Sequence, residues 1–120
     1  ELGRITASVQ SYEKTVELNP KHSDAYLNLG RSYLQLHNLR QSKSTLEKAI
    51  EIDRRSYLAY YYLGVLSQET EEIDLAIEYY LRALRLEPNH PESNNNLGKI
   101  FLSREEFQRA DKLFERARAS

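Results

Sequence analysis

Apolar residues recur along the chain at helical spacing, and the pattern repeats. Residues 23–56, 57–90 and 91–120 each open with a segment whose pattern positions lie at offsets of 0, 3, 4 and 7 residues. These positions are Tyr26, Leu29, Gly30 and Tyr33, then Tyr60, Leu63, Gly64 and Ser67, then Asn94, Leu97, Gly98 and Phe101. Because such offsets place side chains on one face of an α-helix, each frame is predicted to begin with a helix.

A second segment in each frame carries apolar or small residues at offsets of 0, 3, 7 and 10. Its positions are Leu39, Ser42, Leu46 and Ala49, then Ile73, Ala76, Tyr80 and Ala83, then Phe107, Ala110, Phe114 and Ala117. This spacing makes another helical stripe, so each frame is predicted to form two antiparallel amphipathic helices. Residues 1–22 fit the second helix of an earlier unit, with Gly3 at its inter-helix turn. The pattern therefore predicts an all-α chain of about seven helices.

Three of the four glycines, Gly30, Gly64 and Gly98, are spaced by 34 residues. A breaker residue recurring at a period of roughly 20–50 residues is typical of a solenoid repeat. Each glycine lies inside a predicted helix, where it costs about 1 kcal/mol relative to alanine. We expect close packing of the paired helices to offset this cost. The small residues expected to face the glycines are Ala76, Ala83, Ala110 and Ala117.

These residues resemble the tetratricopeptide repeat (TPR), whose pattern is aromatic–x–x–Leu–Gly–x–x–aromatic, then Ala, an aromatic or Leu, Ala and Pro. The frame that matches best, 57–90, holds Tyr60, Leu63, Gly64, Ala76, Tyr80, Ala83 and Pro88 in register. The chain departs from the pattern at Ser42, Arg54 and Asn94.

The resemblance implies a right-handed α-solenoid of stacked antiparallel helix pairs, built as a single domain over residues 1–120. Its parts would be the second helix of a partial repeat at 1–22, repeats at 23–56 and 57–90, and a shortened last repeat at 91–120.

Composition and charge narrow the function. The chain has no Cys, which excludes a disulfide framework and a Cys-ligated metal. A net charge of −1 argues against a general nucleic-acid binder. No apolar stretch reaches about 18 residues, so we expect no membrane insertion. The three histidines lack metal-ligand spacing, and no nucleophile, His and acid are arranged for catalysis. We therefore expect no metal, no cofactor and no enzymatic activity.

Recognition of a protein or peptide partner is the function that we expect instead. In the solenoid that the resemblance implies, first helices line the concave face, and their non-packing positions point into a groove. The candidate groove residues are Leu27, Asn28, Arg31, Leu58, Tyr61, Tyr62, Val65, Asn95, Asn96 and Lys99. The middle of this set is apolar and aromatic, and both ends carry an amide and a cation.

An extended peptide or a helix would place an apolar anchor on Tyr61 and Tyr62. Asn28 and Asn96 would bond its backbone, and Arg31 or Lys99 would meet a carboxylate. For Tyr61, packing between neighbouring first helices is an equal alternative.

A structural role is the second hypothesis: a spacer or self-associating segment of a larger protein, with no peptide in the groove. The helix predicted over about 2–18 lacks a preceding partner, which would expose Ile5 and Tyr12. Such exposure would mark missing upstream repeats, the interpretation that we favour, or a weak homo-oligomer formed through this helix. At the other end, Asp111 and Arg118 are polar where a following repeat would pack, so we expect the array to end near Ser120 or to be followed by a non-repetitive segment.

Overall fold

The computed structural model describes residues 1–119, with all of their side chains except that of Phe107. These residues form helices and turns without a β-strand, as the periodicity predicts. The helices are α1 (Leu2–Leu18), α2 (Ser23–Gln35), α3 (Leu39–Ile52), α4 (Tyr57–Glu69), α5 (Ile73–Leu86), α6 (Pro91–Ser103) and α7 (Phe107–Ala119). Among the described residues, none of the helices has the length and apolar character needed to cross a membrane. Ser120, near which the array is expected to end, lies outside the described residues.

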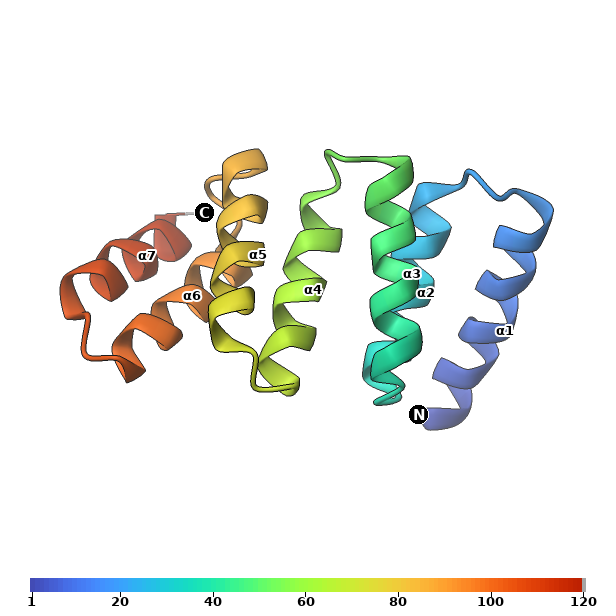
Figure 1. Cartoon of the computed structure of the whole chain (residues 1–120), viewed down its shortest axis with the longest axis horizontal. Coiled ribbons are helices and arrows are strands. Elements are labelled where there is room, and N and C mark those ends of the chain that lie inside the picture. The colour runs from blue at the N-terminus through green and yellow to red at the C-terminus, as the bar shows by residue number, and fades with distance from the viewer. Residues whose placement is uncertain (120) are drawn as a thin grey trace.

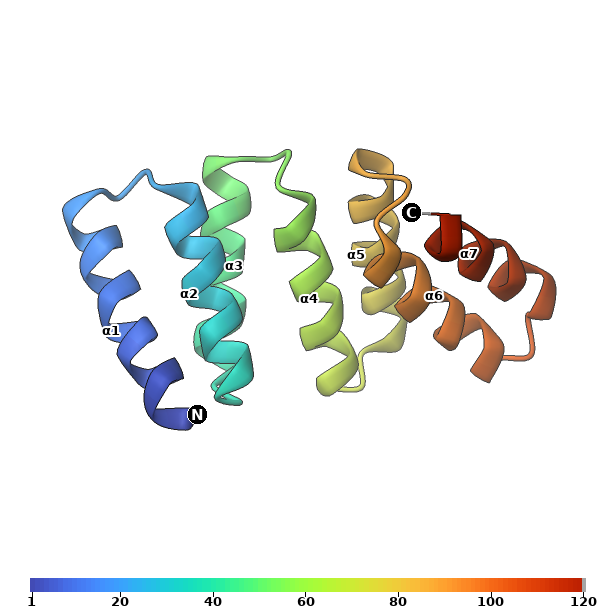
Figure 2. The ribbon, with the colours of Figure 1, turned by 180° about the vertical axis from the view of Figure 1, so that it is seen from behind.

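The helices follow one another in a row and build an elongated α-solenoid (Figure 1). α2 packs with α3, α4 with α5 and α6 with α7, and each pair also contacts the helix before it. α3 and α5 lie toward the viewer in Figure 1, whereas the reverse view in Figure 2 brings α2 and α6 in front of them. The radius of gyration is 15.0 Å. A compact chain of this length would have about 14 Å, so the helices form a row rather than a closed bundle.

Glycine sets the approach of the two helices in each pair. A methyl group added to Gly30 would lie 2.6 Å from the Leu46 side chain, and one added to Gly64 would lie 2.6 Å from the Tyr80 ring. The predicted close approach is therefore confirmed. The predicted small partners are wrong, because the glycines face large side chains of the second helices. The absent Cβ makes room for a bulky residue, which then fills the space between the helices.

The core is a series of three clusters along the row. The first joins α1 and α2 and contains Val9, Leu29 and Tyr33. The second joins α2, α3 and α4 and contains Leu27, Leu46, Ala49, Ala59 and Leu63. The third joins α5, α6 and α7 and contains Ala76, Tyr80, Leu84, Leu97, Ile100, Phe101, Ala110 and Leu113. Each cluster depends on neighbouring helices, as in a repeat array.

The turn inside each helix pair contains a residue with left-handed backbone. His37, Glu71 and Glu105 have φ values of 61°, 61° and 63°, again at 34-residue spacing. In each turn the next backbone N–H donates to the carbonyl five residues earlier at 2.8 Å. This is the hydrogen-bond pattern of a left-handed helix C-cap, and it directs the chain back into the second helix.

The first helix differs from the expectation at three positions. Ile5 and Tyr12 are half-buried rather than exposed, because α1 turns this face partly toward α2, where Tyr12 packs against the first cluster. The exposed apolar side chains of α1 are instead Leu2 and Leu18, at 67% and 77%. Gly3 lies inside α1 rather than in a turn.

Candidate functional site

The candidate groove residues lie on the first helix of each pair: α2, α4 and α6. We call the surface that they share the first-helix face. Its exposed members are Arg31, Asn95 and Lys99, and its half-buried members are Asn28, Leu58, Tyr61, Tyr62, Val65 and Asn96. α2 also contacts α4 directly. The exposed polar residues are therefore on the outer helices, and the apolar residues are on the central one.

Leu27 does not belong to this exposed set. Its side chain is only 9% exposed and lies in the second core cluster with Leu46 and Leu63. The prediction that Leu27 lines an open groove is corrected, because α3 and α4 both pack over it. Leu27 stabilises the contact between helix pairs.

The central helix presents an aromatic pair that packs in two directions. The rings of Tyr61 and Tyr62 meet edge to face, with centroids 5.0 Å apart. Tyr62 packs against the second core cluster, whereas Tyr61 and Val65 pack against the third. Burial, and then the neighbouring charges of Tyr62 and Glu92, raise the pKa of Tyr61. These side chains join the clusters and leave only part of their surface for a partner.

A chain of hydrogen bonds connects α6, α5 and α4 beside this pair. The amide of Asn96 donates to the Tyr80 hydroxyl at 3.3 Å, and that hydroxyl donates to the side-chain oxygen of Gln68. Burial raises the pKa of Tyr80 well above the usual range of a phenol. The amide nitrogen of Asn96 is thus engaged within the protein, so Asn95, which is exposed, is better placed to contact a partner.

His90 is a structural residue that the sequence did not reveal. Its ring lies between Tyr57 and Tyr61, with centroids 5.2 and 5.1 Å away, and is 6% exposed. Nδ1 is 2.7 Å from the Ser93 hydroxyl, and Nε2 is 3.4 Å from a Glu92 oxygen. His90 holds α4 against the start of α6. No sequence motif could show this, because the two tyrosines come from another helix.

The charged groups of the first-helix face are separated by the apolar helix. Arg31 lies on α2 and Lys99 on α6, and no hydrogen bond or ion pair within the described part of the chain engages either side chain. The described residues also contain no group of three His, Cys, Asp or Glu side chains that could hold a metal ion. The chemistry available on this face is hydrogen bonding, ion pairing and apolar contact.

Comparison with protein families agrees with this architecture. A family model described as the tetratricopeptide repeat matches residues 1–39, 27–91 and 68–120. Among curated proteins, the type IV pilus assembly protein PilF of Pseudomonas aeruginosa is 35% identical over 108 residues, which are 90% of this chain and 43% of that protein. The BBSome complex member BBS4 of Xenopus tropicalis is 35% identical over 91 residues, 76% of this chain and 17% of that protein. The chain thus spans less than half the length of these relatives.

Solved structures show the same arrangement of helices. A crystal structure of MamA superposes with a TM-score of 0.80 at 26% identity, covering 91% of this chain and 64% of that one. A MamA structure from Desulfovibrio magneticus RS-1 reaches a TM-score of 0.82 at 23% identity, covering 98% of this chain and 67% of that one.

Proposed function

Because the chain belongs to the tetratricopeptide repeat family, and is thus a protein-interaction scaffold in general, we propose that its first-helix face binds an extended segment of a partner protein. The observation that carries this proposal is the order of side chains across the face. Half-buried apolar residues of α4 stand between two exposed cations, Arg31 on α2 and Lys99 on α6.

Six side chains of this face have a role in the proposed complex. Tyr62 and Val65 offer apolar area to an anchor residue, and tyrosine presents large area at low entropic cost. Asn28 and Asn95 bond the peptide backbone, and the two cations meet acidic groups at the ends of the segment. The preferred ligand therefore has an apolar centre and acidic flanks. Since the contact is small, the complex is transient.

The relatives support partners that are proteins rather than small molecules. One is named as a pilus assembly protein and the other as a member of the BBSome complex. Family members of this kind are generally scaffolds rather than catalysts. The competing role is a structural segment that self-associates, for which Leu2 and Leu18 offer exposed apolar surface on α1.

A random-peptide phage library panned on the intact chain tests the proposal. We expect selected peptides to share an apolar residue flanked by Asp or Glu. The double variant Arg31→Glu/Lys99→Glu should weaken their binding at least about tenfold, because two attractive contacts become repulsive.

The matched control is Arg40→Glu/Lys43→Glu, which makes the same change of charge on exposed positions of α3. It should bind the selected peptides like the unmodified chain. Circular dichroism verifies that both variants stay folded. Equal binding by both variants would refute the first-helix face as the site, and a dimeric mass in light scattering would favour self-association.

A further inference from the structure

A basic cavity opens on the side of the molecule where α3 and α5 lie. It has a volume of about 310 Å³ and is lined by Arg54, Tyr60, Arg82, Arg85 and Leu86. We call it the arginine cavity. Tyr60 adjoins Tyr61 in sequence but turns away from the aromatic pair, so the cavity shares none of the candidate residues of the first-helix face.

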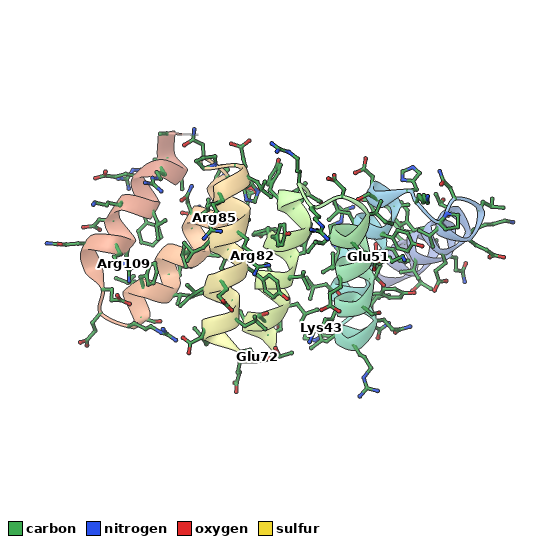
Figure 3. The ribbon with its side chains drawn as sticks, turned by 45° about the horizontal axis from the view of Figure 1, so that its top comes forward. Lys43, Glu51, Glu72, Arg82, Arg85 and Arg109 are labelled. Carbon is green, nitrogen blue, oxygen red and sulfur yellow. The ribbon has the colours of Figure 1, made fainter. Side chains whose placement is uncertain are left out.

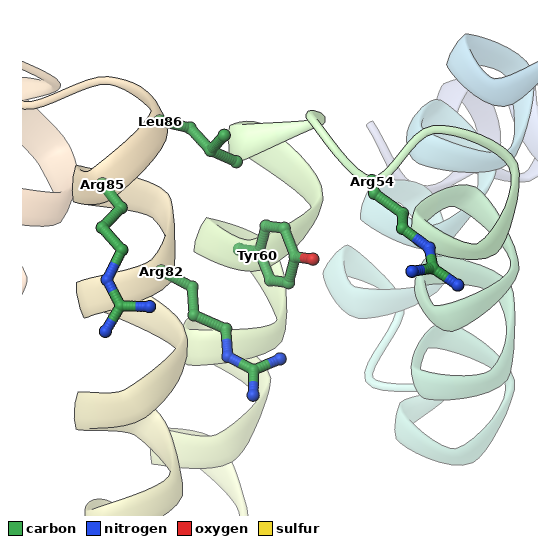
Figure 4. Close-up of a pocket in the computed structure, with 5 residues that line it drawn as sticks. All are labelled: Arg54, Tyr60, Arg82, Arg85 and Leu86. Atoms are coloured by element: carbon green, nitrogen blue, oxygen red, sulfur yellow. The ribbon is translucent and has the colours of Figure 1, made fainter.

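Side chains from three segments converge on the arginine cavity. Arg54 comes from the connection between α3 and α4, Tyr60 from α4, and the other two arginines from adjacent turns of α5. Figure 4 shows the Tyr60 ring projecting between Arg82 and Arg54, with its hydroxyl on the side of Arg54. Figure 3 places Arg82 and Arg85 along the same face of α5.

Three guanidinium groups line the cavity, and no carboxylate is among the described residues that line it. Within the described residues, no hydrogen bond or ion pair engages the side chain of Arg54, Arg82 or Arg85. By contrast, Arg104 pairs with Asp74 at 2.9 Å and Arg109 pairs with Glu106 at 3.0 Å. Like charges gathered without an anion repel one another, and a bound oxyanion would relieve that repulsion.

Acidic residues lie near the arginine cavity but do not line it. Glu51 on α3 pairs with Lys48 at 3.6 Å. Burial raises the pKa of the adjacent Tyr79, and the charges of Glu47, Arg82 and Glu78 also act on it. These acids thus act on Tyr79 or pair with Lys48, and the cavity itself is lined by cationic, aromatic and aliphatic side chains.

The sequence departs from the repeat pattern at this place. Arg54 occupies the position that holds Pro20 and Pro88 in the neighbouring repeats, where proline stops the second helix. Helix α3 still ends at Ile52 without it. The arginine is therefore not needed as a stop signal, and it adds a cation to the mouth of the cavity.

We propose that the arginine cavity binds a phosphate group on a side chain of a partner protein. A phosphate carries nearly two negative charges and three acceptor oxygens, which suit several guanidinium donors better than a single carboxylate does. The Tyr60 hydroxyl supplies a further donor. The Tyr60 ring and Leu86 form an apolar wall that accommodates the stem of the side chain bearing the phosphate, which favours a peptide over a free ion.

The test uses the intact chain and follows its arginine side-chain and tyrosine ring resonances by NMR. The probes are a short phosphoserine peptide, the same peptide with serine or with glutamate, and inorganic phosphate. We expect saturable shifts at the cavity residues with the phosphopeptide, and weaker binding of the other three probes. Arg54→Gln/Arg82→Gln should reduce phosphopeptide affinity at least about tenfold.

The control Arg40→Gln/Arg118→Gln removes the same charge from exposed positions outside the cavity and should leave the affinity unchanged. An equal loss of phosphopeptide affinity in this control would show that only the net charge of the protein matters, and it would overturn the proposal. So would binding of the glutamate peptide or of inorganic phosphate as tight as that of the phosphopeptide. Because all four substituted residues are exposed, unchanged thermal midpoints are expected for both variants.

Discussion

Gly64 lies directly opposite the fully buried ring of Tyr80. An alanine there would place its methyl group 2.6 Å from Cε1 and 2.8 Å from Cδ1 of that ring. Close packing leaves the ring no room to move. We expect Gly64→Ala to destabilise the protein by about 1–3 kcal/mol through this overlap. We expect this destabilisation even though alanine is intrinsically a better helix former than glycine by about 1 kcal/mol. Urea denaturation followed by circular dichroism measures the change.

Gly3→Ala is the matched control for that substitution. Gly3 also lies in a helix, but a methyl group there would meet nothing within 4 Å. The free energy of unfolding of the Gly3→Ala variant should stay unchanged or rise by up to about 1 kcal/mol, as expected from helix propensity alone. A Gly64→Ala protein as stable as the unmodified chain would show that the two helices do not need the missing Cβ.

For single residues, the expectation that depended on sequence spacing is confirmed. The expectation that depended on the direction in which side chains point from a helix is wrong. The 34-residue glycine period predicts a close approach of helices, which the structure confirms. The side chain that packs against each glycine is determined by the rotation of the second helix about its own axis. The hydrophobic periodicity of the sequence does not specify this rotation. Ser42 is another example: its hydroxyl donates to the Gly30 carbonyl at 2.7 Å, an atomic contact across two helices that explains a departure from the repeat pattern.

Helix α1 is attached to the array through α2, and one hydrogen bond contributes to this attachment. The Tyr33 hydroxyl of α2 donates to the Glu13 carboxylate of α1 at 2.6 Å. Burial, followed by this hydrogen bond and the carboxylate charge, raises the pKa of Tyr33 from 10.0 to about 12. The neutral phenol is thus held by the folded state more strongly than by the unfolded chain.

The raised pKa predicts a loss of stability at alkaline pH. Between about pH 10 and 12 the folded state retains a proton that the unfolded chain releases, so stability falls as pH rises. Below pH 10 the contribution of Tyr33 is fully present. We expect the stability advantage of the unmodified chain over Tyr33→Phe to be constant below pH 10 and to shrink above it. Urea denaturation at a series of pH values measures this difference, which cancels the parallel effect of Tyr80. A difference that stays flat across the range would contradict the role of this hydrogen bond.

The elements themselves are the part of the structure that sequence predicts best. Each helix shows its own periodicity, so its existence needs no knowledge of tertiary contacts. The candidate site was predicted less completely, because membership of a surface depends on what packs above it. Leu27 faces inward since two further helices cover it. The convergence of Arg54 with Arg82 depends on how α4 packs against α3 and α5 against α4.

On the scale of the whole molecule, the three core clusters follow one another along an axis of 47 Å. The first and third clusters share no helix. In such an array, stability is the sum of local units and their interfaces, and opening at one end need not open the other.

Paired substitutions at the two ends test this independence. Leu97 is fully buried in the third cluster, and Leu29 is 4% exposed in the first. Either leucine replaced by alanine loses about 2–5 kcal/mol of packing. For Leu97→Ala we expect hydrogen exchange to accelerate mainly in α6 and α7, with α2 changing least, whereas Leu29→Ala should accelerate exchange in α1 and α2 and spare α7. Mass spectrometry of peptic fragments resolves the helices. If hydrogen exchange accelerated uniformly along the chain in both variants, the clusters would unfold as one cooperative unit. Only a shared opening transmits a local loss of packing to helices that do not touch the altered residue.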